Sequence, residues 1–96
     1  MRKTYLISYD ITDTKRRTSV FRALRGRGDH LQFSVFRCDL SEADLVEVKD
    51  ELRDLIHHTV DQVLIVDLGP ADGRALTCFE ALGKGVPAAM RDAIVV

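Results

Sequence analysis

Residues 3–10 form an alternating run that constrains the fold of this chain more than any other segment. β-Branched and aromatic residues dominate the run, and this composition is typical of a strand. One face of the strand, continued by one residue, is apolar and suited to a core: Tyr5, Ile7, Tyr9 and Ile11. The opposite face ends in Asp10, which places a carboxylate where the strand leaves the sheet.

Two helices are predicted from apolar spacing and capping residues. The first runs over about 15–25, after an N-cap at Thr12, Asp13 or Thr14. The second begins at Ser41-Glu42-Ala43-Asp44, which provides its cap, and extends to about His58. Both carry apolar residues at helical spacing, so each is expected to pack one face against a sheet.

The remaining periodic segments are extended: 30–40, 61–68 and a weaker run at 74–82. The segment 30–40 fits either one strand buried on both faces near its end or two short strands joined by a bend, because no Gly or Pro marks a turn. The order of elements predicts an α+β fold with two helices on one face of an antiparallel sheet. With two strands in the middle, the core is the ferredoxin-like βαββαβ arrangement.

A chain of 96 residues is long enough for a single domain, expected over 1–96. We place its core in 3–82 and treat 83–96 as a C-terminal dimerisation tail. The tail ends in Ile94-Val95-Val96, an apolar strand without an obvious place in the sheet. It is therefore expected to pair with a partner subunit, the alternative being a strand docked on its own subunit.

The net charge of −1 conceals an asymmetry between the two halves of the chain. Residues 1–37 carry +6, whereas residues 38–96 carry −7. Such a split suggests a basic face for polyanions, although solvated helices that happen to differ in charge would give the same numbers. No apolar stretch is long enough to span a membrane, and two distant cysteines, Cys38 and Cys78, indicate a reduced, cytoplasmic protein.

Asp10 is the first candidate for catalysis and metal binding. Mg²⁺, or Mn²⁺ in its place, often takes only one or two protein carboxylates and keeps several waters. A two-fold dimer could bring two copies of Asp10 to one cleft, where the metal would activate water or stabilise a leaving oxygen. The competing interpretation is structural: Asp10 caps the first helix or pairs with Arg16 or Arg17.

The residues around Asp10 suggest nucleic-acid binding. Lys15, Arg16 and Arg17 could neutralise backbone phosphates, as could two further arginines of the same helix. Tyr9 alternates with core residues, yet its hydroxyl at the strand end could meet a phosphate or base. Asp67 is a second carboxylate only if its strand end approaches Asp10; otherwise it serves the following turn.

The chain resembles a known family in a set of motifs that spans residues 4 to about 68. The motifs are Tyr9-Asp10-Ile11, then Asp13 with Lys15-Arg16-Arg17, Gly28, Gln32-Phe33-Ser34-Val35-Phe36, and Asp61-Gln62-Val63-Leu64-Ile65. This pattern is similar to that of the Cas-two family of CRISPR-associated proteins, the second of the two universal spacer-acquisition proteins. The segment after Pro70 departs most from the family.

The resemblance implies a ferredoxin-like fold and a symmetric homodimer whose C-terminal strands cross to the partner's sheet. It further implies that Asp10 of each subunit holds Mg²⁺ for a metal-dependent endonuclease that acts on RNA, including single-stranded RNA, or on double-stranded DNA. Arg16 and Arg17 would be the contacts to the nucleic-acid backbone, with Tyr9 beside the site. The expected partners are integrase (Cas-one) dimers, which the homodimer bridges while it holds duplex DNA.

Three functions are therefore open: a spacer-acquisition subunit with nuclease activity, a non-catalytic DNA-binding scaffold, and a ferredoxin-like ligand-binding regulatory module. The first rests on Asp10 beside a basic helix. The second rests on the sparse set of metal ligands and on the charge asymmetry. We favour the spacer-acquisition subunit, and the regulatory module is the weakest of the three.

Overall fold

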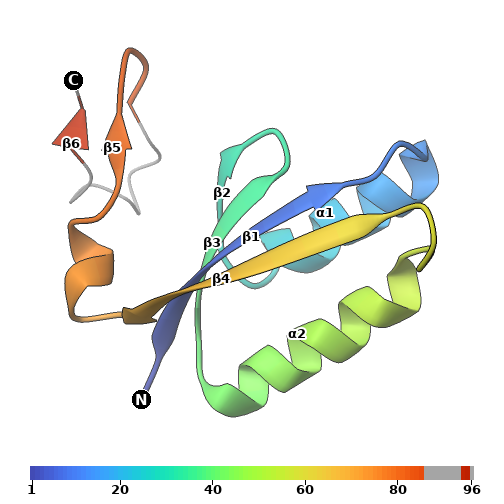
Figure 1. Ribbon diagram of the computed structural model, residues 1–96, viewed down its shortest axis with the longest axis horizontal. Helices are drawn as coiled ribbons and strands as arrows, with labels where there is room; N and C mark the ends of the chain where they lie inside the picture. Colours follow the sequence, from blue (N-terminus) through green and yellow to red (C-terminus); the bar gives the residue numbers. More distant parts are fainter. Residues whose placement is uncertain (86–93, 96) are drawn as a thin grey trace.

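The computed structural model describes residues 1–85 and 94–95, and its core is a four-stranded antiparallel sheet with two helices on one face (Figure 1). The order of strands is β2-β3-β1-β4. The core elements are β1 (Lys3–Asp10), α1 (Thr14–Arg25), β2 (Asp29–Gln32), β3 (Val35–Leu40), α2 (Glu42–Leu55) and β4 (Gln62–Pro70). This βαββαβ order confirms the predicted α+β, ferredoxin-like fold.

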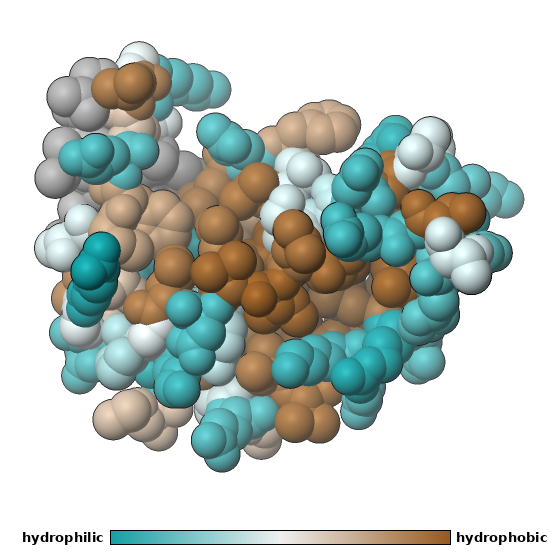
Figure 2. Space-filling view, viewed as in Figure 1, coloured by the Kyte–Doolittle hydropathy of each residue, from teal (hydrophilic) through white to brown (hydrophobic). Residues whose placement is uncertain are grey.

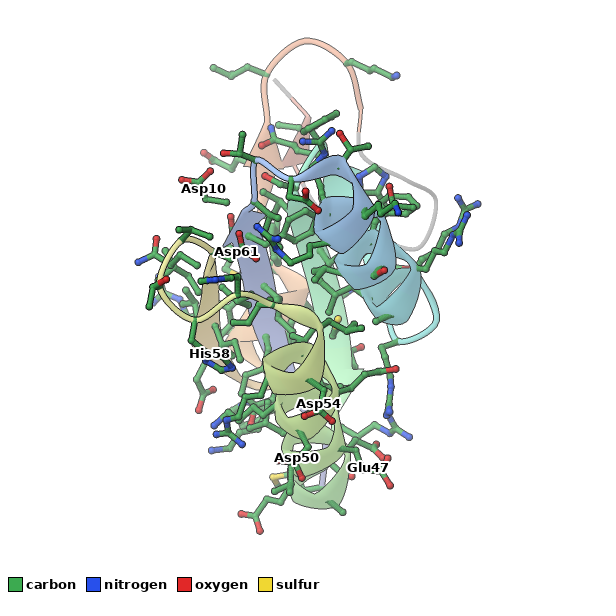
Figure 3. The ribbon with its side chains drawn as sticks, turned by 90° about the vertical axis from the view of Figure 1, so that its right-hand side faces the viewer. Asp10, Glu47, Asp50, Asp54, His58 and Asp61 are labelled. Carbon is green, nitrogen blue, oxygen red and sulfur yellow. The ribbon has the colours of Figure 1, made fainter. Side chains whose placement is uncertain are left out.

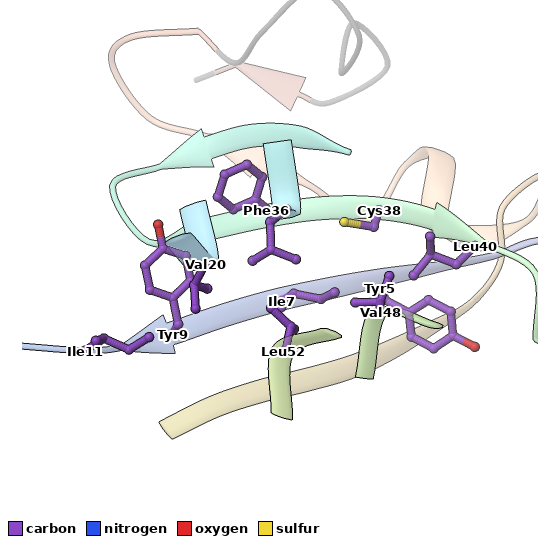
Figure 4. Packing of buried hydrophobic residues seen from close by; sticks show 11 residues of the cluster. Tyr5, Ile7, Tyr9, Ile11, Val20, Phe36, Cys38, Leu40, Val48 and Leu52 are labelled. Carbon is purple, nitrogen blue, oxygen red and sulfur yellow. The ribbon is translucent and has the colours of Figure 1, made fainter. Parts of the chain in front are cut away.

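The central strand β1 supplies the floor of the hydrophobic core (Figure 4). Its predicted inner face is buried at every position, with Tyr5, Ile7, Tyr9 and Ile11 at most 5% exposed. The helices cover this face with four buried residues: Val20 and Leu24 from α1, and Val48 and Leu52 from α2. Burial of large apolar side chains of this kind is the dominant stabilising term of the fold.

Both helices begin at the capping sites that the sequence predicted. Asp13 is the N-cap of α1, and its carboxylate accepts a hydrogen bond from the backbone N–H of Arg16 at 2.9 Å. Ser41 and Asp44 form a reciprocal capping box at the start of α2. This second helix ends at Leu55, three residues earlier than predicted, because the chain turns through residues 57–61 into β4.

The segment 30–40 is two strands, as the second of the two interpretations held. They are joined by a turn at Phe33 and Ser34, although neither residue is a Gly or Pro. The carbonyl of Ser34 accepts a hydrogen bond from the backbone N–H of Tyr9 at 3.1 Å, so the turn is attached to β1. The end of β1 therefore lies beside this turn (Figure 1).

The prediction of a strand over 74–82 was wrong. The chain leaves the sheet after Pro70, the last residue of β4, and forms a short 3-10 turn, η1 (Arg74–Leu76). Gly69, just before the end of β4, has a φ of 89°, which is accessible to glycine. Only β5 (Glu80–Ala81) is extended, and it pairs in parallel with β6 (Ile94–Val95) of the same chain. Pairing of the tail with a partner subunit stays a prediction, and most of 83–96, namely 86–93 and Val96, lies outside the described residues.

Gly28 shows why a glycine is needed where α1 turns into β2. A Cβ atom there would collide with the backbone carbonyl of Arg37 and lie 2.6 Å from Sγ of the buried Cys38. Gly26, two residues earlier, is a matched control because a Cβ at that position would meet nothing closer than 3.6 Å.

We predict that Gly28→Ala destabilises the fold by about 1–3 kcal/mol, the typical cost of overpacking. Gly26→Ala should leave stability nearly unchanged. Urea unfolding followed by circular dichroism measures both free energies of unfolding. Equal stability of the two variants would contradict the close approach of β3 to Gly28.

An ion pair ties α1 to the turn before β4. Arg16 donates from Nε to Oδ2 of Asp61 at 2.6 Å, and the backbone N–H of His57 donates to the same oxygen at 2.8 Å. These contacts, the Arg16 hydrogen bond foremost, lower the pKa of the Asp61 carboxyl from its ordinary value of 3.8. Its side chain is only 1% exposed, so the contact is shielded from water.

We predict that Asp61→Asn destabilises the protein at pH 7. Because the folded pKa is below the unfolded one, the carboxylate stabilises the fold fully above pH 3.8, and this contribution is lost as pH falls through the lowered pKa. The stability difference between wild type and variant should therefore shrink below about pH 4. Asp50→Asn, which breaks an exposed pair with Arg53, is the control and should cost about 0.5 kcal/mol or less.

A stability difference between wild type and Asp61→Asn that stays constant from pH 7 to pH 3 would contradict this assignment. Urea unfolding at several pH values provides the measurement.

Candidate nucleic-acid interface

Asp10 ends β1 on the face of the sheet that the helices leave uncovered (Figure 3). Its side chain is exposed, and it forms no hydrogen bond or ion pair with any residue that the structure describes. Asp13, rather than Asp10, caps α1, and neither Arg16 nor Arg17 pairs with Asp10. The structural interpretation of Asp10 is therefore wrong, and its carboxylate is available to bind a ligand.

Two of the three predicted cations bind their own chain. Arg16 holds Asp61 through two hydrogen bonds, at 2.6 and 3.2 Å. Arg17 donates to the backbone carbonyls of Ile11 and Thr12 at 3.3 and 3.1 Å, across the loop that follows Asp10. Both guanidinium groups therefore shape the chain on either side of the carboxylate.

A separate row of cations follows the exposed side of α1. Lys15, Arg22 and Arg25 are exposed and have no carboxylate partner among residues 1–85. Together with Thr18 they are spaced three, four and three residues apart, which places them on one stripe of the helix. The stripe extends over about 15 Å at 1.5 Å per residue. Hereafter the three cations of this stripe are called the α1 basic row.

Tyr9 lies inside the core rather than on the surface. Its ring is 4% exposed and stacks on Phe36, with 6.4 Å between the ring centroids. Its hydroxyl approaches the carbonyl oxygen of Phe33 at 3.5 Å, and burial raises the pKa of the phenol. Tyr9 thus adjoins the Asp10 position along the chain, and its side chain supports the β2–β3 turn.

The structure separates Asp67 from Asp10. Asp67 pairs in register with Tyr5 at the other end of β1, forms an ion pair with Lys3 at 3.4 Å, and accepts a hydrogen bond from the backbone N–H of Gly69. The Gly69 contact is the main reason why the pKa of the Asp67 carboxyl is lowered. Asp67 therefore serves the turn after β4, as the alternative interpretation held.

Asp61 is the carboxylate that the fold does bring to the same end of the sheet, since Gln62 is in register with Asp10. It is fully engaged by Arg16, so each chain offers one available carboxylate here. No group of three His, Cys, Asp or Glu side chains within 1–85 and 94–95 is arranged to hold a metal. One exposed carboxylate fits a largely hydrated Mg²⁺, above all if a second chain supplies another.

One further exposed residue at this end of the sheet was not singled out from the sequence. Phe33, in the β2–β3 turn, is 78% exposed. The sequence carries no signal for this exposure, because Phe33 alternates with the polar residues Gln32 and Ser34 as a core-facing strand residue would. Its exposure follows from the turn at 33–34.

Comparisons with known proteins agree with this architecture. A curated relative from Geobacter sulfurreducens, "CRISPR-associated endoribonuclease Cas2", is 33% identical over the full length of both chains. A Rhodospirillum rubrum protein of the same description is 38% identical over 96% of this chain and 89% of its own. The crystal structure of Streptococcus pyogenes Cas2 superposes with a TM-score of 0.64 at 29% identity, over 69% of this chain and 86% of that chain.

No helix within the described part of the chain is long and apolar enough to cross a bilayer. A family model described as CRISPR associated protein Cas2 matches residues 3–74, which include every core strand and both helices. The chain therefore belongs to the Cas2 family of CRISPR-associated proteins.

Proposed function

We propose that this protein is a cytoplasmic spacer-acquisition subunit of a CRISPR system with a Mg²⁺-dependent endonuclease activity toward RNA. The observation that carries the nuclease part is the Asp10 carboxylate, which is exposed, unpartnered and adjacent to a basic helix. The names of the relatives as endoribonucleases support the same reaction class.

The proposed active form is a homodimer that brings two copies of Asp10 into one cleft. Strand β4 is an edge of the sheet, so its outer side can accept a strand from a second copy. Leu64 and Val66 on this strand are 54% and 45% exposed, and apolar side chains gather over the uncovered face of the sheet (Figure 2). A second chain would bury them.

Asp10 would hold the metal in this dimer, with Mn²⁺ as a substitute for Mg²⁺. When bound, such an ion activates water and stabilises charge on the leaving oxygen of a phosphodiester. Arg17 keeps the loop after Asp10 in place through its two carbonyl contacts, so it positions the carboxylate. The α1 basic row would attract the phosphates of the substrate.

The second candidate is a scaffold that holds duplex DNA and bridges Cas-one integrase dimers without cutting. The α1 basic row favours it, because a straight stripe of cations suits a regular phosphate backbone and does not require Asp10. One protein can have both functions. They can be distinguished experimentally, because the nuclease requires Asp10 and the scaffold requires the α1 basic row.

We predict that Asp10→Asn abolishes Mg²⁺-dependent cleavage of single-stranded RNA and leaves the fold intact. Because Asp10 is exposed and unpaired, the variant should change the free energy of unfolding by no more than about 0.5 kcal/mol. Gel-resolved cleavage with and without EDTA measures the activity. Cleavage by Asp10→Asn at the wild-type rate would place the reaction elsewhere or in a contaminant.

We predict that replacing Lys15, Arg22 and Arg25 by Gln weakens binding to duplex DNA and reduces its salt dependence. If each contacts one phosphate, the slope of log K against log salt should fall by about 2–3 in total. Fluorescence anisotropy at several salt concentrations provides both numbers. Arg53→Gln on α2 is the control, since Arg53 is similarly exposed but pairs with Asp50 on the acidic helix.

An unchanged slope in the triple variant would contradict this role of the α1 basic row. Cleavage would then rest on other phosphate contacts, and the scaffold candidate would lose its support from α1.

A further inference from the structure

Lys15 differs from the other lysines of the chain in the charge of its surroundings. Lys3 forms an ion pair with Asp67 at 3.4 Å. Lys49 belongs to α2, a helix with six acidic residues and two cations. Lys15 belongs to α1, which carries five cations and no acidic residue. Its amine is therefore the lysine amine of these two helices that stands in a positive field.

Three features attract a small anion to Nζ of Lys15. The side chain is exposed and has no carboxylate partner within residues 1–85. Asp13, two residues earlier, is bound by the backbone N–H and the guanidinium of Arg16. Arg22 follows on the same stripe of the helix, about 10 Å further along its axis. Lys15 is also the second residue of α1, where the free backbone N–H groups add partial positive charge.

Lys15 is the member of the α1 basic row whose charge acyl transfer can remove. The other two members, Arg22 and Arg25, carry guanidinium groups, which stay protonated in proteins. A lysine ammonium instead releases a proton to give a nucleophilic amine, and acetylation commonly targets this amine. Conversion of the amine to an amide removes its charge. The row would then keep two of its three cations.

We propose that Lys15 is an acylation site for small acyl phosphates, the mixed anhydrides of a carboxylic acid and phosphoric acid. Acetyl phosphate is the simplest of them. The deprotonated Nζ attacks the carbonyl carbon, so that an N–C bond forms and the C–O bond to the phosphate breaks. The phosphate leaves with the electron pair of that bond, and the nitrogen releases a proton to water. Nothing is oxidised or reduced, and the product is a neutral amide.

Acylation of Lys15 would lower the affinity of the α1 basic row for duplex DNA. This consequence rests on the proposed function of the row, whereas the reaction itself does not. A row with one cation fewer contacts one phosphate fewer, so the slope of log K against log salt should fall by about 1. Bound DNA would in turn slow the reaction, because its phosphates occupy the cations that attract the acyl phosphate.

The competing explanation is that Lys15 reacts only because it is exposed. Lys84 is the matched comparison, since it is also exposed but shares the lining of a groove with Glu80 instead of belonging to a row of cations. A neutral acetyl donor, the N-hydroxysuccinimide ester of acetic acid, reacts with both amines without electrostatic attraction. The ratio of the two rates with this ester therefore measures exposure and intrinsic reactivity. An excess of that ratio with acetyl phosphate measures the attraction of the anion.

The test incubates the full chain with either donor and follows acetylation of each lysine by peptide mass spectrometry. The salt concentration is about 0.01 M, where the Debye length is about 30 Å. We expect a higher ratio of the Lys15 rate to the Lys84 rate with acetyl phosphate than with the ester. This excess should disappear at about 1 M salt, where the Debye length is about 3 Å.

Variants identify the source of the attraction and its effect on binding. Arg22→Gln should slow the reaction of Lys15 with acetyl phosphate by about two- to threefold at low salt, because it removes a cation about 10 Å away. Arg53→Gln on α2 is the control and should leave this rate unchanged. After treatment with acetyl phosphate, the wild type should bind duplex DNA with a salt slope lower by about 1. Lys15→Arg, which keeps the cation and offers no amine, should keep its slope after the same treatment.

The same Lys15-to-Lys84 ratio with both donors would overturn the proposal, and so would an unchanged rate in Arg22→Gln. An equal loss of slope in treated wild type and treated Lys15→Arg would assign the effect on DNA binding to another lysine. Preferential acetylation of Lys15 without any effect on DNA binding would support the acylation site. That last result would remove the proposed DNA-binding role of the α1 basic row instead.

Discussion

The side-chain alternation of β1 is the constraint on which the rest of the structure depends. Its inner residues are buried beneath both helices, and β3 and β4 pair with it on either side. A slip of one residue in either pairing would exchange the two faces and expose the core. The same alternation places Asp10 on the uncovered face. The position of this candidate metal-binding carboxylate therefore follows from the packing of Ile7 and Tyr9 on the opposite face.

Some of the cations near Asp10 make contacts within the chain and others are exposed to solvent, and the linear sequence does not show which are which. Lys15, Arg16 and Arg17 are consecutive, yet a helix turns successive residues by 100°, so they face different surroundings. Arg16 reaches the buried Asp61, Arg17 reaches backbone carbonyls, and Lys15 stays in water. Of three consecutive cations, Arg16 and Arg17 therefore stabilise the local structure, and Lys15 is the first residue of the α1 basic row.

Elements with strong local signals could be predicted from the sequence, and those fixed by distant contacts could not. Asp13 and Ser41 predicted the starts of the two helices, because an N-cap bonds to backbone N–H groups only two or three residues away. The early end of α2 depends on the Asp61 carboxylate, which also holds Arg16 from another element. Residues 74–82 have a strand-like composition, but no edge of the four-stranded sheet receives them, and only Glu80–Ala81 is extended.

The candidate site shows the same division. Asp10 and the basic helix were evident from residue types, whereas the separation of Asp67 from Asp10 depends on the pairing of β4 with β1. Asp67 looks like a second ligand in the linear sequence, but its strand runs antiparallel to β1 and carries it to the far end, opposite Tyr5. Asp61 lies at the near end, and there Arg16 and the backbone N–H of His57 already bind its carboxylate. The exposed carboxylate of Asp10 is therefore a consequence of strand register and of one ion pair, both of which join residues far apart in the sequence.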